Sequence, residues 1–427
     1  MKKDNINMEK VIIIGVDLDS DVINIENSLD ELEELVKAAG GTVAARLVQK
    51  RNKINPAYFI GKGKAEEIKN YCFELNASTV VFNDELSGAQ IRNLEDIIDK
   101  KIVDRTNLIL DIFANRADSK EGRLQVKLAQ LKYRLPRLVG FRDYLSREGG
   151  GIGTRGPGEQ KLETDRRHIL REINNIEDQL MDIEKNRDIK RRKRKDSNLP
   201  IVALVGYTNA GKSTLLNKMI SLTDEGETRK EVFVKDMLFA TLDTSLRRGN
   251  LPNGQVFLLT DTVGFVSKLP TKLVEAFKGT LEEVQHADLL IHVIDASNED
   301  LDIQIKTTHE LLKDLEVLEK PIITVFNKID KAEVHNLFYD NNFVDDKIFI
   351  SAFDDNDIKK LLDKIQELLP QSFKKVKIKL PYDEQSIINY FMENYNILST
   401  EYAEKGTILE LTINSIDYDK YTEFIIE

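Results

Sequence analysis

One short segment, GYTNAGKST at residues 206–214, constrains this chain more than any other part of the sequence. It fits the phosphate-binding pattern G-x-x-x-x-G-K-S/T. The apolar residues 201–205 before it predict a buried strand, and apolar residues recur after it at helical spacing from Leu215 to Ile220. A glycine loop between a strand and a helix directs backbone N–H groups at phosphate oxygens. The sequence therefore predicts a nucleoside triphosphate site.

Two side chains of this loop have separate predicted roles. We expect Lys212 to neutralise the β- and γ-phosphates, and the Ser213 hydroxyl to hold Mg²⁺. The loop residues expected to contact the nucleotide are Gly206, Tyr207, Thr208, Asn209, Ala210, Gly211, Lys212, Ser213 and Thr214.

A second motif, D-x-x-G, ends a predicted strand that begins at Leu258. We expect the Asp261 carboxylate to reach Mg²⁺ through a water molecule, and the Gly264 N–H to contact the γ-phosphate. Thr262 and Val263 complete the motif and are included in the predicted nucleotide site.

A third motif, N-K-x-D, predicts which base the nucleotide carries. It follows a predicted buried strand and comprises Asn327, Lys328, Ile329 and Asp330. A carboxylate only accepts hydrogen bonds, and guanine offers it N1–H and N2–H₂ groups. Adenine lacks the 2-amino group, so facing it would leave a buried charge poorly paired, at a cost of about 1–3 kcal/mol. The loop expected to close over the base is Ser351, Ala352 and Phe353. Together these motifs predict GTP.

The predicted γ-phosphate-sensing loop lies between the first helix and the D-x-x-G strand. It comprises Phe239, Ala240, Thr241, Leu242 and Asp243. The Thr241 hydroxyl would be a second protein ligand to octahedral Mg²⁺. The alternative is that Thr241 is an ordinary residue that opens a strand running to Arg248.

Composition predicts a cytoplasmic, globular protein of two to four domains. The 427 residues are 41% hydrophobic and 32% charged, which is enough apolar material for a sizeable core. No apolar run approaches the length of a membrane span, and the first residues lack the apolar core of a signal peptide. The single cysteine, Cys72, excludes an internal disulfide framework. We expect a monomer whose net charge of −11 disfavours polyanion binding by the whole surface.

Four domains are expected along the chain. Residues 1–115 alternate strands and helices, which predicts a small parallel α/β domain. Residues 116–198 form a helical arm, 199–370 a P-loop GTPase domain with a mostly parallel sheet, and 371–427 a small α/β domain. In the first domain, the sequence GKGK at residues 61–64 joins an extended segment to a helix. It either holds a phosphate at the helix N-terminus or forms a tight turn with exposed lysines.

The arm gathers basic charge within an acidic chain. Over residues 123–155, eight Lys or Arg side chains stand against two acidic ones, a local balance of +6. Leucine and isoleucine spacing predicts two paired helices with a glycine-rich loop at the tip. Solvated helix faces are one explanation of the charge; structured RNA, contacted through its phosphates, is the one we favour. The residues expected to contact RNA are Arg147, Gly149, Gly150, Gly151, Gly153, Arg155, Gly156 and Gly158.

Several segments resemble the HflX family of bacterial ribosome-associated GTPases, in the Obg-HflX superfamily. They are residues 107–117, 121–126, 149–159, 261–265 and 268–283, and the resemblance extends over about residues 10–365. It implies binding to the large ribosomal subunit near the peptidyl-transferase region, and dissociation of stalled or idle ribosomes. It also implies that some members bind ATP through the N-terminal domain, which bears on residues 61–64. The chain departs from the family at Thr244, where a proline is usual, so the stiffness of the neighbouring loop is in doubt.

Hydrolysis is expected to depend on help from outside the loop. Many GTPases have a glutamine after D-x-x-G that orients the attacking water, but this chain has Phe265. An apolar side chain cannot orient water, so intrinsic hydrolysis should be slow. Either K⁺ bound near Asn209 or the ribosome itself would supply the missing positioning. The predicted catalytic residues are Lys212, Thr241, Gly264 and Asn209.

These observations predict a GTPase that binds the large subunit, dissociates 70S ribosomes and hydrolyses GTP to GDP and phosphate. One alternative is a signalling switch that recruits a protein partner through its helical arm. Another is an RNA chaperone that needs no hydrolysis, whose function would survive the loss of Lys212.

Overall fold

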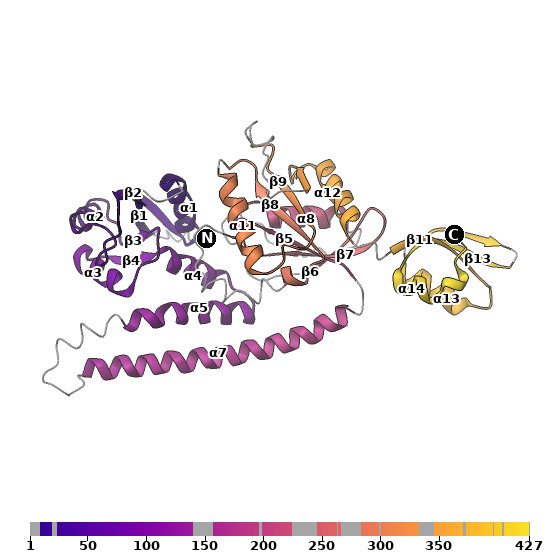
Figure 1. The fold of residues 1–427 in the computed structure, drawn as a ribbon, viewed down its shortest axis with the longest axis horizontal. Helices are drawn as coiled ribbons and strands as arrows, with labels where there is room; N and C mark the ends of the chain where they lie inside the picture. Colours follow the sequence, from indigo (N-terminus) through magenta and orange to yellow (C-terminus); the bar gives the residue numbers. More distant parts are fainter. Residues whose placement is uncertain are drawn as a thin grey trace, which may run out of the picture. The chain divides into compact units, whose positions relative to one another are not determined.

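A computed structural model of the chain contains three separate sheets among the residues that it describes, and Figure 1 labels most of their strands. It describes residues 9–18, 24–139, 157–195, 199–223, 246–262, 264–265, 283–298, 300–332, 346–369, 373–395, 397–403 and 405–426. The element order confirms the predicted α/β class, with a small parallel α/β unit and a helical arm before the P-loop sheet and a small α/β unit after it. The predicted domain boundaries near residues 115, 198 and 370 stay predictions.

The first sheet has four parallel strands in the order β2-β1-β3-β4. The strands are β1 (Glu9–Leu18), β2 (Gly41–Arg51), β3 (Thr79–Phe82) and β4 (Lys101–Asp104). The helices are α1 (Ile25–Ala38), α2 (Lys62–Glu74), α3 (Gly88–Ile98) and α4 (Arg105–Arg116). Successive strand residues point to opposite faces, so α1 and α4 pack on one face and α2 and α3 on the other.

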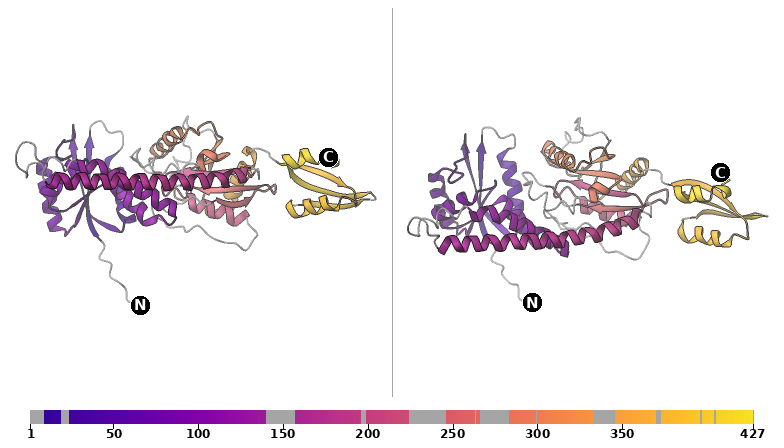
Figure 2. Two further views of the ribbon diagram at one scale, coloured as in Figure 1. Left: turned by 90° about the horizontal axis from the view of Figure 1, so that it is seen from below. Right: turned by 60° about the horizontal axis from the view of Figure 1, so that its bottom comes forward.

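Two long helices, α5 (Lys120–Val139) and α7 (Pro157–Lys195), lie side by side in Figures 1 and 2. Their apolar seam consists of Leu128, Leu131, Ile169, Ile173 and Ile176. Lys132 and Glu177 form an ion pair of 2.8 Å across the seam. The predicted pairing of two arm helices is therefore confirmed.

The second sheet has six strands in the order β10-β9-β8-β5-β7-β6. The strands are β5 (Ile201–Gly206), β6 (Leu246–Asn250), β7 (Val256–Asp261), β8 (Leu289–Asp295), β9 (Ile322–Asn327) and β10 (Asp346–Phe349). Only β6 runs antiparallel to its neighbour among these strands. Helices α8 (Lys212–Thr223) and α12 (Asp355–Leu368) cover one face, and α11 (Leu301–Asp314) covers the other. The carboxyl ends of β5, β7, β8 and β9 therefore meet at one edge.

The third sheet is antiparallel, with the order β11-β13-β12. Its elements are β11 (Phe373–Leu380), α13 (Gln385–Asn394), β12 (Ile397–Ala403), β13 (Gly406–Asn414), α14 (Ser415–Lys420) and a 3₁₀ turn (Thr422–Phe424). Phe391 of α13 is fully buried in its small core. Among the described helices of the whole chain, none has the length and apolar character needed to cross a membrane.

Candidate nucleotide-binding site

The phosphate-binding loop needs glycine at two positions. Gly206 ends β5 with φ +143°, and a Cβ atom there would lie 2.2 Å from the Val293 carbonyl oxygen of β8. Gly211 has φ +93°, and its Cβ would lie 2.4 Å from the Asn327 Nδ2 atom. Between them, Asn209 adopts φ +60°, a conformation that asparagine tolerates better than most residues. The loop thus lies directly against the end of β9.

Lys212, the first residue of α8, is buried and turned back onto the loop. Its ammonium donates hydrogen bonds to the carbonyl oxygens of Gly206 (3.0 Å) and Tyr207 (2.8 Å). Burial lowers the pKa of Lys212 to about 8, and the nearby Asp261 carboxylate opposes this shift. An anion placed in the loop would restore the preference for the charged form.

Ser213 and Asp261 bring two oxygen ligands together. The Ser213 hydroxyl donates a 2.5 Å hydrogen bond to the Asp261 carboxylate, and the Thr262 N–H donates to the same carboxylate at 2.9 Å. The Thr262 hydroxyl in turn donates to the Leu204 carbonyl oxygen at 2.7 Å, which ties the end of β7 to β5. A hydroxyl and a carboxylate are oxygen ligands of the kind that Mg²⁺ prefers, so this pair fits the predicted ion.

The base-recognition motif is bonded to the phosphate loop. The Asn327 amide donates to the Ala210 carbonyl oxygen at 2.9 Å and accepts from the Ala352 N–H at 3.0 Å. The Lys328 ammonium donates to the Asn209 carbonyl oxygen at 2.7 Å. The structure therefore brings the phosphate loop together with two motifs that lie more than a hundred residues further along the chain.

Asp330, the predicted guanine reader, is exposed at the rim of the site. Its carboxylate accepts a 2.7 Å hydrogen bond from the Ser351 hydroxyl. The Ser351 N–H donates to Asp357 of α12 at 3.0 Å, which fixes this loop to the helix. Ala352 is buried, whereas the Phe353 side chain is 70% exposed. Within the same motif, the Ile329 N–H donates to the Ile350 carbonyl oxygen at 3.4 Å. Thr214, the last residue of the predicted phosphate loop, lies in the first turn of α8.

Part of the predicted site lies outside the described residues. This applies to Phe239, Ala240, Thr241, Leu242, Asp243 and Val263 of the nucleotide site. It applies also to Arg147, Gly149, Gly150, Gly151, Gly153, Arg155 and Gly156 of the arm, whereas Gly158 lies in the first turn of α7. Gly264 and Phe265 are described and buried. Within the described residues, no group of three or more His, Cys, Asp or Glu side chains could hold a metal ion.

One carboxylate at this edge was not predicted from the sequence. Asp295 ends β8 and accepts a 2.7 Å hydrogen bond from the Lys328 ammonium. The available signal was its place directly after a buried strand, since ligand-facing groups gather at the carboxyl ends of parallel strands.

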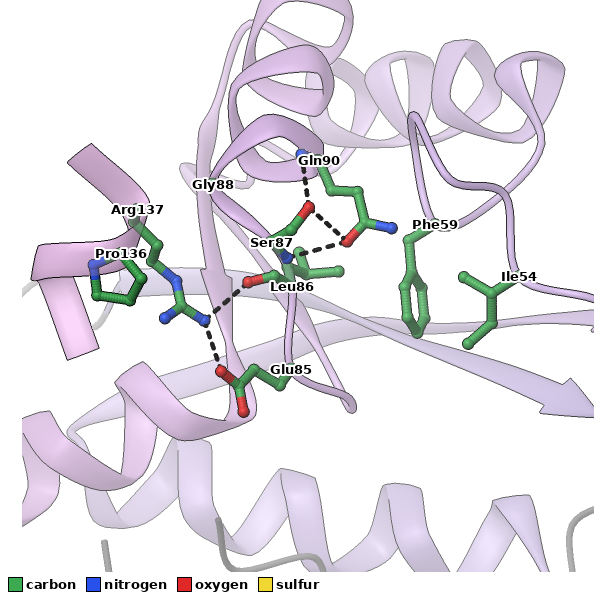
Figure 3. A pocket seen from close by; sticks show the side chains of 9 residues that line it. All are labelled: Ile54, Phe59, Glu85, Leu86, Ser87, Gly88, Gln90, Pro136 and Arg137. Atoms are coloured by element: carbon green, nitrogen blue, oxygen red, sulfur yellow. Dashed lines mark hydrogen bonds and ion pairs between the residues drawn. The ribbon is translucent and has the colours of Figure 1, made fainter. Parts of the chain in front are cut away.

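The N-terminal sheet has a pocket of its own, of about 510 Å³. It lies at the start of α3, and Figure 3 shows Phe59 and Ile54 across from Arg137. The Arg137 guanidinium donates to Glu85 (3.0 Å), the Leu86 carbonyl oxygen (2.7 Å) and the buried Asp104 (3.1 Å). Residues 61–64 do not line it. The pocket is lined by Ile54, Phe59, Glu85, Leu86, Ser87, Gly88, Gln90, Pro136 and Arg137.

The segment at residues 61–64 has its own contacts. The Gly61 N–H donates to the Gln49 side chain at 2.8 Å, and Lys64 forms a 2.8 Å ion pair with Glu67. Gly61 is the N-cap of α2 and provides no side-chain cap. The phosphate site and the turn with exposed lysines both stay predictions for this segment.

Three protein-family models match the chain. Residues 26–114 match a model described as GTP-binding GTPase N-terminal, and residues 116–194 match one described as GTP-binding GTPase Middle Region. Residues 201–328 match a model described as 50S ribosome-binding GTPase. The last match covers β5 to the start of the base-recognition motif.

Proteins named GTPase HflX in several bacteria are similar to nearly the whole chain. The protein from Caldanaerobacter subterraneus subsp. tengcongensis is 50% identical, over 94% of this chain and 91% of its own. The protein from Lacrimispora saccharolytica is 46% identical over 95% and 94%, and that from Escherichia coli K12 is 39% identical over 91% and 90%. A solved structure of SsGBP in complex with GDP is 27% identical, covers 85% of this chain and 99% of that chain, and has a TM-score of 0.48.

Proposed function

We propose, from the premise that this chain belongs to the HflX family of GTPases, that it binds the large ribosomal subunit and dissociates stalled or idle 70S ribosomes. That the chain is a GTP-binding GTPase, which hydrolyses GTP to GDP and phosphate, follows from the family itself. The observation that carries the ribosomal part is the match of residues 201–328 to a model described as a 50S ribosome-binding GTPase. We place its action in the cytoplasm, as a monomer.

The proposed nucleotide site is the set of loops at the carboxyl edge of the second sheet. Ser213, Thr241 and, through a water, Asp261 would hold Mg²⁺, which when bound neutralises charge on the phosphate oxygens. Lys212 would bind the β- and γ-phosphates, and the Gly264 N–H would contact the γ-phosphate. The 2.5 Å contact between Ser213 and Asp261 supports this assignment, since both side chains already converge on one point.

Water activation is the step for which the described part of this site provides no side chain. Phe265 follows Gly264 and is only 3% exposed. Because its side chain is apolar, it offers the attacking water no hydrogen bond. We expect slow hydrolysis by the free protein. Either K⁺ near Asn209 or the ribosomal surface would then complete the positioning. Equal rates in K⁺ and Na⁺ buffers would exclude the role of K⁺.

The basic arm is the proposed RNA contact. Arg147, Arg155 and the glycines of residues 149–158 would approach rRNA phosphates closely because glycine leaves the backbone accessible. The apolar seam of Leu128, Leu131, Ile169, Ile173 and Ile176 holds the two arm helices together, so a bound arm would act as one unit.

Sucrose-gradient sedimentation tests the proposal directly. Intact 70S ribosomes would be mixed with the protein and a non-hydrolysable GTP analogue, with GDP as the nucleotide control. We expect separation into subunits with the analogue, and loss of that separation when residues 149–158 are deleted. If 70S ribosomes stay intact and no protein sediments with them, the signalling-switch alternative replaces this function. If the Lys212→Ala protein still separates the subunits fully, the alternative of an RNA chaperone that needs no hydrolysis replaces this function.

ATP binding by the N-terminal domain is a second candidate, favoured by the pocket at the start of α3. Its volume of about 510 Å³ suits a small ligand, and Ser87 and Gly88 at the start of α3 line it, so the positive end of the helix dipole lies at the pocket. Titration of the Lys212→Ala protein with ATP would report binding outside the GTP site. Ile54→Trp, which fills the pocket wall, should abolish that binding, whereas Phe73→Trp on the exposed face of α2 should not.

A further inference from the structure

Asp295 lies at the centre of the contacts that join β8, β9 and the phosphate loop. One oxygen of its carboxylate accepts hydrogen bonds from the Ser297 N–H (3.0 Å) and hydroxyl (2.6 Å). The other oxygen accepts from the Lys328 ammonium at 2.7 Å. The Asp295 N–H donates to Gln304 of α11 at 3.1 Å. The backbone and the side chain of Asp295 are therefore both held in place.

Lys328 links the Asp295 carboxylate to the phosphate loop. Its ammonium contacts Asp295 and the Asn209 carbonyl oxygen, each at 2.7 Å, and the two charged side chains are only 21% and 16% exposed. Lys328 also adopts φ +63°, which is uncommon for a residue with a long side chain. A lysine side chain has four rotatable bonds, so an ammonium with a single acceptor would sample many positions. The partly buried Asp295 carboxylate is a second acceptor, and it restricts the Lys328 ammonium to one position.

We propose that Asp295 is a positioning residue of the guanine-nucleotide site, acting through Lys328 on the Asn209 carbonyl and hence on the shape of the phosphate loop. This inference rests on GTP binding and does not depend on the ribosomal part of the proposed function. Asp295 sets how tightly nucleotide binds, whereas Asp330 sets which base is bound. The two carboxylates thus have different effects on affinity and on selectivity.

Asp295→Asn tests this with little change of shape. Loss of one charge-assisted hydrogen bond should weaken GDP binding by about tenfold, as measured by fluorescence titration. The ratio of GDP to XDP affinity should stay as in the wild type, because Asp330 is intact. The matched control is Asp288→Asn, which alters the carboxylate at the opposite end of β8, where it accepts from the Ile201 N–H at 2.8 Å. This control should bind GDP as the wild type does.

A double-mutant cycle separates positioning from general stabilisation. In a Lys328→Met background, Asp295→Asn should weaken GDP binding by less than about twofold, because the Lys328 ammonium that Asp295 positions is already absent. An equal tenfold loss in both backgrounds would overturn the proposal. Ser297→Ala is a milder change, because it removes one hydrogen bond to the Asp295 carboxylate and leaves the charge in place. It should weaken GDP binding by about threefold. Wild-type affinity in both Asp295→Asn and Ser297→Ala would likewise overturn the proposal.

Discussion

The Ser213 hydroxyl and the Asp261 carboxylate, 48 positions apart in sequence, are joined by a hydrogen bond of 2.5 Å. Ser213 belongs to the first turn of α8, and Asp261 ends β7. Parallel pairing of β5 with β7 brings the two elements to the same edge, with Leu204 opposite Asp261. The contact therefore follows from the register of the strands. It joins two side chains that we predicted from the sequence to hold the same Mg²⁺ ion.

Ser213→Ala should remove the Mg²⁺-dependent part of nucleotide binding. We expect the affinity for GDP in the presence of Mg²⁺ to fall by at least about tenfold, because the ion loses one of its oxygen ligands. In EDTA the variant and the wild type should bind alike. The matched control is Ser221→Ala near the end of α8, whose hydroxyl donates only to the Lys218 carbonyl oxygen. Equal losses with and without Mg²⁺ would contradict the assignment of Ser213 to the ion.

Gly211→Ala should weaken nucleotide binding through the backbone alone. The residue has φ +93°, and its Cβ would lie 2.4 Å from the Asn327 amide nitrogen that holds the Ala210 carbonyl. We expect a loss of at least about 1–3 kcal/mol of binding free energy by calorimetry. Gly63→Ala is the control, since a Cβ there meets no atom within 4 Å. Normal GDP binding by Gly211→Ala would mean that the loop has another conformation with nucleotide.

The phosphate loop and the base-recognition motif could be predicted from the sequence because short motifs follow buried strands. Residues 201–205 form a continuous apolar run, residues 321–326 are apolar except for Thr324, and each segment is directly followed by its motif. In a parallel sheet such ends meet, as the bond from Asn327 to Ala210 illustrates. Local pattern was therefore sufficient for this part of the site.

Features made by packing were not predictable in the same way. Helix α4 has buried residues around most of its circumference, including Ile109, Leu110 and Phe113, so it lacks the one-sided apolar period that indicates a helix. The pocket in Figure 3 combines the connections after β2 and β3 with Pro136 and Arg137 of α5. Asp295 belongs to no motif. Its role depends on Lys328, which only the pairing of β8 with β9 brings beside it.

Asp330→Asn should change the base that the protein prefers. The Asp330 carboxylate can only accept, which suits the N1–H and N2–H₂ groups of guanine, whereas an amide can donate to the 2-oxo group of xanthine. We expect GTP hydrolysis to decline and XTP hydrolysis to rise, with the preference changed by at least about a hundredfold. The control is Asp363→Asn on the exposed face of α12. If Asp330→Asn kept the wild-type preference for GTP, another group would have to read the base.

Lys212 should make nucleotide binding sensitive to pH. Its pKa is lowered from 10.5 to about 8 in the nucleotide-free protein, mainly by burial. Phosphate favours the charged form, so binding at higher pH requires uptake of a proton. The affinity for GDP should therefore fall as pH rises, by about tenfold between pH 7 and pH 9.

The stability of the nucleotide-free protein should follow the opposite trend. The unfolded chain, with the ordinary pKa of 10.5 at Lys212, holds more protons than the folded chain above a pH of about 8. The contribution of Lys212 to the unfolding free energy therefore rises with pH in that range. Thermal denaturation at several pH values, compared with Lys212→Arg, would measure this contribution.

Calorimetry in two buffers of different ionisation enthalpy would count the protons taken up on GDP binding. The N1–H of guanine also titrates in alkaline solution, so the decisive comparison is between variants. Lys218→Arg, which changes a half-exposed lysine of the same helix, should keep the wild-type pH dependence. Lys212→Arg should lose most of it, because arginine stays charged throughout. A pH dependence that persists unchanged in Lys212→Arg would show that the proton belongs to the nucleotide or to another side chain.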